Sequence, residues 1–195
     1  MYRRFFKRMI DITISILVLP VVILVILIVG PIIYLEDKGP IFYNANRIGK
    51  GGKLFKMFKL RTMKENSPDI RLADGSTYNG DDDPRVTKVG SILRKTSLDE
   101  LPQFLNILIG DMSLIGPRPD TPEDLDSYTD EEKIILKVLP GITGLNQAEN
   151  RNSVDSKTKL QNDIRYVKEL SFSLDFKILF LTIKTVLLRK NINRC

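Results

Sequence analysis

Residues 1–39 read MYRRFFKRMIDITISILVLPVVILVILIVGPIIYLEDKG, and this stretch decides where the protein resides. A cluster of arginines and lysines precedes an apolar run that extends from Ile12 to about Leu35. One bilayer crossing needs about 20 apolar residues, so the run has the length of a membrane segment. It is too long for a cleaved signal peptide and lacks a small-residue cleavage site. We therefore predict membrane attachment through the N-terminus.

The charges around this run suggest how it is inserted. Basic residues favour the cytoplasmic side of a membrane, and residues 38–61, after the run, are as basic as residues 3–8, before it. Pro20 lies near the middle and removes a backbone hydrogen bond. Two legs of about ten residues each would reach roughly half the hydrocarbon depth. A helix-break-helix that enters and leaves on one face satisfies both flanks. A plain kinked transmembrane helix is the alternative, and the charges alone do not decide.

Composition narrows the classes of partner. The chain has 195 residues, enough for one compact domain, and a net charge of +6 that favours anionic partners such as nucleic acid, anionic lipid or phosphorylated substrates. Its single cysteine is Cys195, which excludes a disulfide within one chain and fits a reducing compartment. There is no histidine, so the commonest general base is absent.

The rest of the chain is expected to be mainly helical, with one small hairpin. Residues 41–63 resemble two strands around a Gly-Lys-Gly-Gly turn, and residues 64–85 form a polar loop. Helical patterns occupy residues 86–108, 125–138, 160–170 and 174–190, and residues 141–152 are loop-like. The last helix carries an apolar stripe with a basic border. This pattern suits a helix at a membrane surface and also an ordinary core helix.

Opposite charges gather in residues 94–119, RKTSLDELPQFLNILIGDMSLIGPRP. The structural interpretation is a capping box, in which Ser97 caps a helix and Glu100 bonds back to it. Pro102 disfavours that interpretation because it falls just past the first turn. The chemical interpretation is a carboxylate nucleophile, Asp99, that attacks phosphorus, with cations nearby to offset the phosphate charge. Arg118 lies between two prolines, which suits a fixed phosphate-binding guanidinium.

These residues and three further stretches carry a resemblance. The chain resembles the bacterial sugar transferases, the monotopic polyprenyl-phosphate phosphoglycosyl transferases. The matching stretches are FKLRTM (58–63), DPRVTKVGSILRKTSLDELPQFLNILIGDMSLIGPRP (83–119), PGITGLNQ (140–147) and DIRYVKELSFSLDFKILFLTIKT (163–185). The resemblance covers nearly the whole chain. It implies transfer of a sugar-1-phosphate from a UDP-sugar to undecaprenyl or another polyprenyl phosphate, with release of UMP.

The resemblance also assigns roles to residues. It implies that Asp99 is the nucleophile that forms a covalent phosphosugar intermediate and that Glu100 is its partner, the two holding Mg²⁺. Family positions around the substrate match Arg94, Arg118, Arg151, Lys59 and Asp163. The surroundings of Arg151 differ from the family pattern, with Leu145 and Asn150 where the family often has Trp and Gly, so the identity of the sugar stays open.

The architecture implied by the resemblance completes the expectation. It is an α+β protein, mainly helical, with a re-entrant membrane hairpin at residues 1–36 that breaks at Pro20. Residues 37–195 would form a cytosolic catalytic domain with membrane-interface helices, on the cytoplasmic face of the bacterial inner membrane. Expected partners are the UDP-sugar, the polyprenyl phosphate, membrane lipid and later glycosyltransferases, and nucleic acid is not one of them. The oligomeric state is left open. The rivals are a membrane-anchored module that binds anions and a structural scaffold.

Overall fold

The computed structural model describes residues 1–71, 78, 80, 82–150 and 154–187. Helices dominate, as expected from the sequence. The described residues also form two small two-stranded sheets, where the sequence predicted a single hairpin. The α-helices are α1 (Lys7–Asp37), α2 (Lys88–Thr96), α3 (Gln103–Ile109), α4 (Leu145–Glu149), α5 (Ser156–Glu169) and α6 (Phe172–Leu187). The strands are β1 (Ala45–Ile48), β2 (Leu54–Met57), β3 (Ser113–Ile115) and β4 (Gly141–Thr143). Short turns of other helix types are η1 (Tyr2–Phe6), η2 (Lys50–Gly52), η3 (Leu98–Glu100), η4 (Pro122–Ser127) and η5 (Glu132–Lys137).

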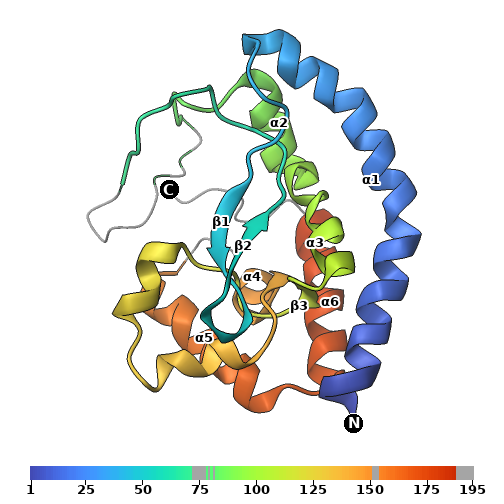
Figure 1. The fold of residues 1–195 in the computed structure, drawn as a ribbon, viewed down its shortest axis with the longest axis vertical. Coiled ribbons are helices and arrows are strands. Elements are labelled where there is room, and N and C mark those ends of the chain that lie inside the picture. The colour runs from blue at the N-terminus through green and yellow to red at the C-terminus, as the bar shows by residue number, and fades with distance from the viewer. Residues whose placement is uncertain (72–77, 79, 81, 151–153, 188–195) are drawn as a thin grey trace.

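The apolar run forms a single helix, α1, of 31 residues. At 1.5 Å per residue it is about 46 Å long. Among the described residues, it is the one helix that is long and apolar enough to cross a membrane. Pro20 and Pro31 both lie inside it, so the expected interruption at Pro20 is wrong: the backbone stays helical. A proline removes one bond of the ladder, and the bonds on either side persist. Figure 1 shows the helix bowed instead of broken.

Both ends of α1 are bound to the rest of the protein by charged side chains. At its start, Lys7 pairs with Asp175 of α6 at 2.7 Å, and Arg8 donates to the carbonyl of Ile107 at the end of α3, also at 2.7 Å. At its other end, Glu36 accepts from the backbone amide of Lys88, the first residue of α2, at 2.7 Å. The helix therefore lies along one compact body that contacts it at both termini.

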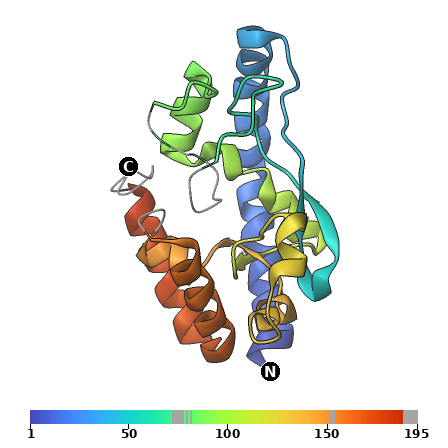
Figure 2. The same cartoon turned by 90° about the vertical axis from the view of Figure 1, so that its left-hand side faces the viewer.

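Between these ends α1 is largely exposed and apolar. Ser15, Val22 and Ile33 are buried, whereas the large aliphatic side chains on the other faces are open, Leu17 at 72% and Leu27 at 67%. Figure 2 shows α1 running the length of the molecule, with the β1–β2 hairpin on one side and α5 and α6 on the other. The exposed face has the composition of a surface in contact with hydrocarbon.

The expected hairpin is confirmed. β1 and β2 pair antiparallel, with Ala45 opposite Met57 and Ile48 opposite Leu54. Gly51 and Gly52 in the connecting turn both have positive φ, a region that glycine adopts without steric cost. Beyond the strands the pairing continues as an isolated bridge between Phe42 and Leu60, which carries the chain toward the candidate site.

Several expected boundaries were wrong. The helical pattern of 86–108 divides at Ser97, whose left-handed backbone (φ 57°) ends α2. The helix expected at 125–138 is replaced by η4 and η5. The expected loop 141–152 instead contains β4, which pairs parallel with β3, and α4. Such short elements are held by tertiary hydrogen bonds, which local patterns do not reveal.

The main core lies where α4, α5 and α6 meet β3 and β4. Tyr166, Met112 and Ile178 are fully buried in it. The Tyr166 hydroxyl donates to Asp175 at 2.8 Å and contacts the Ile115 carbonyl at 3.0 Å. α6 packs Ile178 into this core while four large apolar side chains stay exposed. These are Phe172, Phe176, Phe180 and Ile183.

Candidate active site

The extended segment after β2 brings Lys59 to the acidic pair. The Lys59 carbonyl accepts from Tyr43, the Leu60 amide donates to the Asp99 carbonyl, and the Arg61 amide donates to Ile41, each at 2.9 Å. The segment is thus held between residues 41–43 on one side and the 99–100 turn on the other. Because both sides are fixed by backbone hydrogen bonds, the side chain of Lys59 projects from a rigid stretch of backbone.

Lys59 bridges the two carboxylates. Its Nζ lies 2.8 Å from Asp99 Oδ2 and 3.5 Å from Glu100 Oε1. Arg118 Nη2 approaches the same Glu100 oxygen at 3.0 Å. Burial raises the pKa of Glu100, but Arg118 and Lys59 together outweigh it and lower that pKa to about 2. Glu100 is therefore ionised at neutral pH.

The backbone explains why Asp99 and Glu100 lie side by side yet differ in exposure. They occupy η3, the tight turn between α2 and α3. Asp99 has only 4% of its side chain exposed, whereas Glu100 has 21%. Ser97 makes no side-chain capping hydrogen bond, so the capping-box interpretation is wrong, and Pro102 precedes α3 as its N-cap residue. The carboxylates are consequently free of a capping role.

Arg94 reaches this cluster from the last turn of α2. Its Nε donates to the Thr62 hydroxyl at 3.0 Å, which ties it to the segment that carries Lys59. Burial lowers the pKa of the Arg94 guanidinium, and the negative charge of Asp99 acts in the opposite direction. The helix therefore directs a partly dehydrated cation toward the acidic pair.

Comparison with known proteins assigns the family. The family model described as "Bacterial sugar transferase" matches residues 2–189 of the chain. The chain belongs to the bacterial sugar transferase family. Its relatives in this family include the galactosyl transferase CpsE of Streptococcus agalactiae, 40% identical over 93% of this chain. They also include the undecaprenyl-phosphate galactose phosphotransferase of Salmonella typhimurium (42% over 95%) and the exopolysaccharide production protein ExoY of Sinorhizobium fredii (42% over 94%).

These sugar transferases differ in length. The chain spans 42% of CpsE and 41% of the Salmonella protein, but 86% of ExoY. The shared region is therefore about two fifths of the longer relatives, and it contains all of the candidate site.

In this family member, a second group of charges surrounds Arg118. Asp163 of α5 is buried, and one of its carboxylate oxygens, Oδ1, makes no hydrogen bond. Burial and the nearby Asp120 raise the pKa of Asp163 to about 8, against the effect of the Arg118 amide. Asp163 is thus mostly protonated at neutral pH. The family resemblance matched Asp163 to a position near the substrate, and in the structure it lies beside Arg118.

Arg47, on β1, is a neighbour that the sequence did not indicate. Burial lowers the pKa of its guanidinium, and Arg118 acts in the same direction while Asp120 opposes it. Arg47 and Arg118 are therefore close enough to repel each other. In the sequence, Arg47 is one of several basic residues that follow the apolar run, so its proximity to Arg118 had no local signal.

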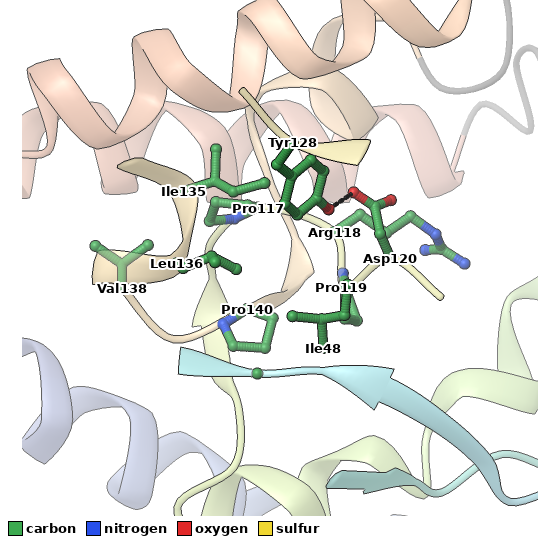
Figure 3. Close-up of a pocket in the computed structure, with 11 residues that line it drawn as sticks. Ile48, Pro117, Arg118, Pro119, Asp120, Tyr128, Ile135, Leu136, Val138 and Pro140 are labelled. Carbon is green, nitrogen blue, oxygen red and sulfur yellow. Dashed lines mark hydrogen bonds between the residues drawn. The ribbon is translucent and has the colours of Figure 1, made fainter. Parts of the chain in front are cut away.

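A small pocket lies behind Arg118 (Figure 3). Its walls are mostly apolar and include Ile48, Ile135, Val138 and Pro140. The Tyr128 hydroxyl donates to Asp120 at one side, and the Arg118 guanidinium extends away from the apolar side chains. The pocket thus supports the backbone of the Pro117–Pro119 segment, while the charged end of Arg118 faces Glu100.

The side chains of the site determine whether they could bind a metal ion. Among the described residues, no three acidic, histidine or cysteine side chains gather as they would in a preformed metal cage. Asp99 and Glu100 provide two carboxylates. Mg²⁺ is commonly held by one or two carboxylates together with substrate phosphates, so the pair fits Mg²⁺ when a phosphorylated substrate completes the shell.

Of the predicted site residues, Lys59, Arg94, Asp99, Glu100 and Arg118 come together in one cluster. Asp163 joins it through Arg118. Arg151 lies outside the described residues.

Proposed function

We propose that the chain is a phosphoglycosyl transferase that moves a sugar-1-phosphate from a UDP-sugar to undecaprenyl phosphate or a similar polyprenyl phosphate. The proposal rests on family membership and on the Salmonella relative, which is an undecaprenyl-phosphate galactose phosphotransferase. The structural observation that carries it is the Lys59 ammonium between two carboxylates, with Arg118 on the second. Alternating charges of this kind suit a site that must hold phosphates beside an anionic nucleophile.

In the first half-reaction, an Asp99 oxygen attacks the phosphorus next to the sugar. The bond from that phosphorus to the bridging oxygen breaks, and the electron pair leaves with UMP. Lys59 and Arg118 offset the negative charge that would repel the incoming diphosphate. Because Asp99 is nearly inaccessible to solvent, water has little access to the acyl phosphate that results.

In the second half-reaction, an oxygen of the lipid phosphate attacks the same phosphorus. The bond to Asp99 breaks, the carboxylate is regenerated, and the sugar is left on a lipid diphosphate. A phosphate monoester is largely ionised near neutral pH, so it needs no strong base for this step. The absence of histidine is therefore consistent with the proposed chemistry.

Mg²⁺ is the proposed cofactor. Asp99 and Glu100 are the residues that would hold it, and when bound it would neutralise charge on the diphosphate of the donor. Glu100 suits this role because its low pKa keeps it ionised at neutral pH. Lys59 would then contact both carboxylates and the substrate phosphates. Its position between Asp99 and Glu100 allows this.

The same-face insertion of α1 is part of the proposal. A helix that crossed a bilayer would have its ends on opposite sides. Here Lys7 binds α6 at one end and Glu36 binds α2 at the other, both in the same body. We therefore propose that the bowed helix dips into one leaflet from the cytoplasmic side of the inner membrane. The exposed phenylalanines of α6 would rest at the same surface.

The product of this reaction would be a lipid-linked sugar. Only a glycosyltransferase that accepts such a lipid could extend it, so later enzymes of this class are the expected partners.

Release of UMP tests the function. Purified protein in nanodiscs would be incubated with Mg²⁺, undecaprenyl phosphate and a panel of UDP-sugars. We expect release with at least one sugar, and its loss in Asp99→Asn. Asp126→Asn, which changes an exposed aspartate in the same way, is the matched control and should keep full activity. Folded wild-type protein that is silent with every sugar, or an active Asp99→Asn, would contradict the proposal.

A further inference from the structure

Asn106 of α3 is a buried polar residue that the proposed chemistry does not use. Its exposed fraction is 0%. Its carboxamide binds a distant part of the chain: Oδ1 accepts from the backbone amide of Phe58, and Nδ2 donates to the carbonyl of Lys56, each at 2.8 Å. Because an amide N–H only donates and a carbonyl only accepts, one orientation of the carboxamide satisfies both partners. The side chain is therefore fixed at both of its polar atoms.

The two hydrogen bonds lie on the edge of β2 that faces away from β1. The extended segment 56–61 bonds alternately to two sides, as extended backbone does. From residue 59 on, its odd-numbered residues bond to residues 41–43, on the hairpin side. Its even-numbered residues bond to the opposite side, through the Asn106 side chain and the Asp99 carbonyl. In the described part of the chain the sheet contains only β1 and β2. Asn106 thus occupies the place that a third strand would take.

Lys59 lies between two residues that are held on this edge. Phe58 is bound by Asn106, and the Leu60 amide donates to the Asp99 carbonyl at 2.9 Å. From this backbone the Lys59 ammonium reaches the two carboxylates of the acidic pair at 2.8 and 3.5 Å. A lysine side chain is a flexible four-carbon stem. The position of its Nζ between two carboxylates consequently depends on where its backbone is held.

The main chain of Asn106 contributes to the segment that carries the other cation of the site. Its carbonyl accepts from the amides of residues 110–112, at 3.1, 3.0 and 3.2 Å. These bonds end α3 and begin the turn into β3, after which the chain continues to Arg118. A substitution of the side chain leaves this carbonyl in place. The connection to Lys59 can therefore be tested while the backbone connection toward Arg118 is kept.

We propose that Asn106 is a positioning residue for Lys59. Its carboxamide imitates the peptide group of a neighbouring strand and fixes the backbone from which Lys59 reaches Asp99 and Glu100. The inference rests on the proposed function, because it states how the cation of that mechanism is held beside the nucleophile. A displaced Lys59 would stabilise the charge of the transition state less well. Arg118 would still bind Glu100, so the ground-state binding of the donor should change less than the rate.

The first test measures kcat and KM separately. Exchange of labelled UMP into the UDP-sugar, without acceptor, reports the first half-reaction alone. In Asn106→Ala we expect the kcat of exchange to fall about 10- to 100-fold, the size for a misplaced catalytic group, and the KM for the UDP-sugar to change less than about threefold. Ile178→Val shortens a fully buried side chain of α6, a helix that the hydrogen bonds of Asn106 do not reach. It controls for lost core packing and should keep kcat within about twofold.

The second test addresses the hydrogen bonds themselves. Asn106→Asp keeps the shape of the side chain. A neutral carboxyl both donates and accepts, so it can restore both bonds, whereas a carboxylate only accepts and would face the Lys56 carbonyl. Burial raises the pKa of a carboxyl at such a position. The kcat of Asn106→Asp relative to the wild type should therefore rise at least about threefold as the pH falls from 8.5 to 6. The same ratio for Asn106→Ala should stay constant.

Circular dichroism would establish that each variant is folded under the assay conditions. The inference is overturned by a folded Asn106→Ala with the kcat of the wild type, or by an equal fall in Ile178→Val, which would assign the loss to packing. A raised KM with unchanged kcat would also overturn it, because Asn106 would then act on substrate binding. So would a constant ratio for Asn106→Asp across the pH range, and this result decides alone if Asn106→Ala does not fold. Failure of the wild type to exchange UMP would instead contradict the proposed function.

Discussion

Arg61 binds both carboxylate oxygens of Asp37, the last residue of the membrane helix α1. The guanidinium is buried and also donates to the carbonyls of Pro40 and Met63. Arg61 is two residues from Lys59 on the same extended segment. The Arg61 side chain therefore ties the end of α1 to the segment that carries Lys59, the lysine that bridges Asp99 and Glu100.

This pairing predicts that Asp37 affects catalysis from a distance. Asp37→Ala would leave a buried guanidinium without its anion, and removal of one partner of a buried pair costs about 3–5 kcal/mol. Because 22% of the Asp37 side chain is exposed, we expect the lower end of that range or slightly less. We also expect kcat to fall while the KM for the UDP-sugar changes little.

The control uses an exposed ion pair. Asp130→Ala removes the partner of Lys133 on the surface, where both side chains are open, and should cost at most about 1 kcal/mol. Thermal unfolding and initial rates would be measured for both variants. Equal, small effects of the two substitutions would show that Arg61 does not depend on Asp37.

Same-face insertion predicts which residues a reagent outside the membrane can reach. With Cys195 replaced by serine, a cysteine placed directly after Met1 and Lys38→Cys should both resist a membrane-impermeant maleimide in intact spheroplasts. Both should react after lysis, because both flanks of α1 would then be exposed to reagent. Labelling of one of the two in intact cells would show a transmembrane helix and would contradict the bowed, same-face arrangement.

Asp175 is expected to hold the start of α1 against the core. It is buried and accepts from Tyr2 at 2.5 Å, Lys7 at 2.7 Å and Tyr166 at 2.8 Å. Asp175→Ala would leave the partly buried Lys7 ammonium, the partly buried Tyr2 hydroxyl and the buried Tyr166 hydroxyl without this acceptor, so we expect a loss of about 3 kcal/mol. Urea unfolding in detergent would measure it. Asp111→Ala, for which the structure shows no ion pair among described residues, should change the midpoint little; a comparable shift would argue against a special role for Asp175.

The sequence predicted which charged residues of the site gather better than it predicted the architecture around them. Asp99, Glu100 and Arg118 are close in sequence, and their crowded charges together with the family resemblance identified them as a group. Asp37 and Arg61 were visible as charged residues, but their pairing spans 24 positions and depends on the path of the chain after α1. The continuity of α1 through Pro20 depends likewise on packing and on the remaining hydrogen bonds, which a local rule for proline does not include.

Gly90 illustrates a constraint that becomes visible only in three dimensions. A Cβ at this position of α2 would lie 2.0 Å from the carbonyl oxygen of Thr62, the residue that binds Arg94. Gly90→Ala should therefore displace α2 or the Thr62 segment, in spite of the better helix propensity of alanine. We expect lower stability and at least a tenfold loss of activity. Ser91→Gly, which changes the next residue of the helix without adding atoms, should cost only about 1 kcal/mol. A stable, fully active Gly90→Ala would show that the two segments can separate freely.

Asp163 predicts an unusual dependence of stability on pH. Its pKa in the folded protein is about 8, mainly because it is buried, whereas a free aspartate has a pKa of about 3.9. Between these values the folded state binds more protons than the unfolded state, so this residue makes stability fall as the pH rises from about 4 to 8. Asp163→Asn keeps the shape and cannot ionise, so it should flatten that decline and be the more stable protein at pH 8 by more than about 1 kcal/mol. Urea midpoints at pH 5, 6.5 and 8 would be compared with those of Asp126→Asn, an exposed position expected to follow the wild type. Parallel curves for Asp163→Asn and wild type would mean that Asp163 is already ionised in the folded protein and finds a cation there.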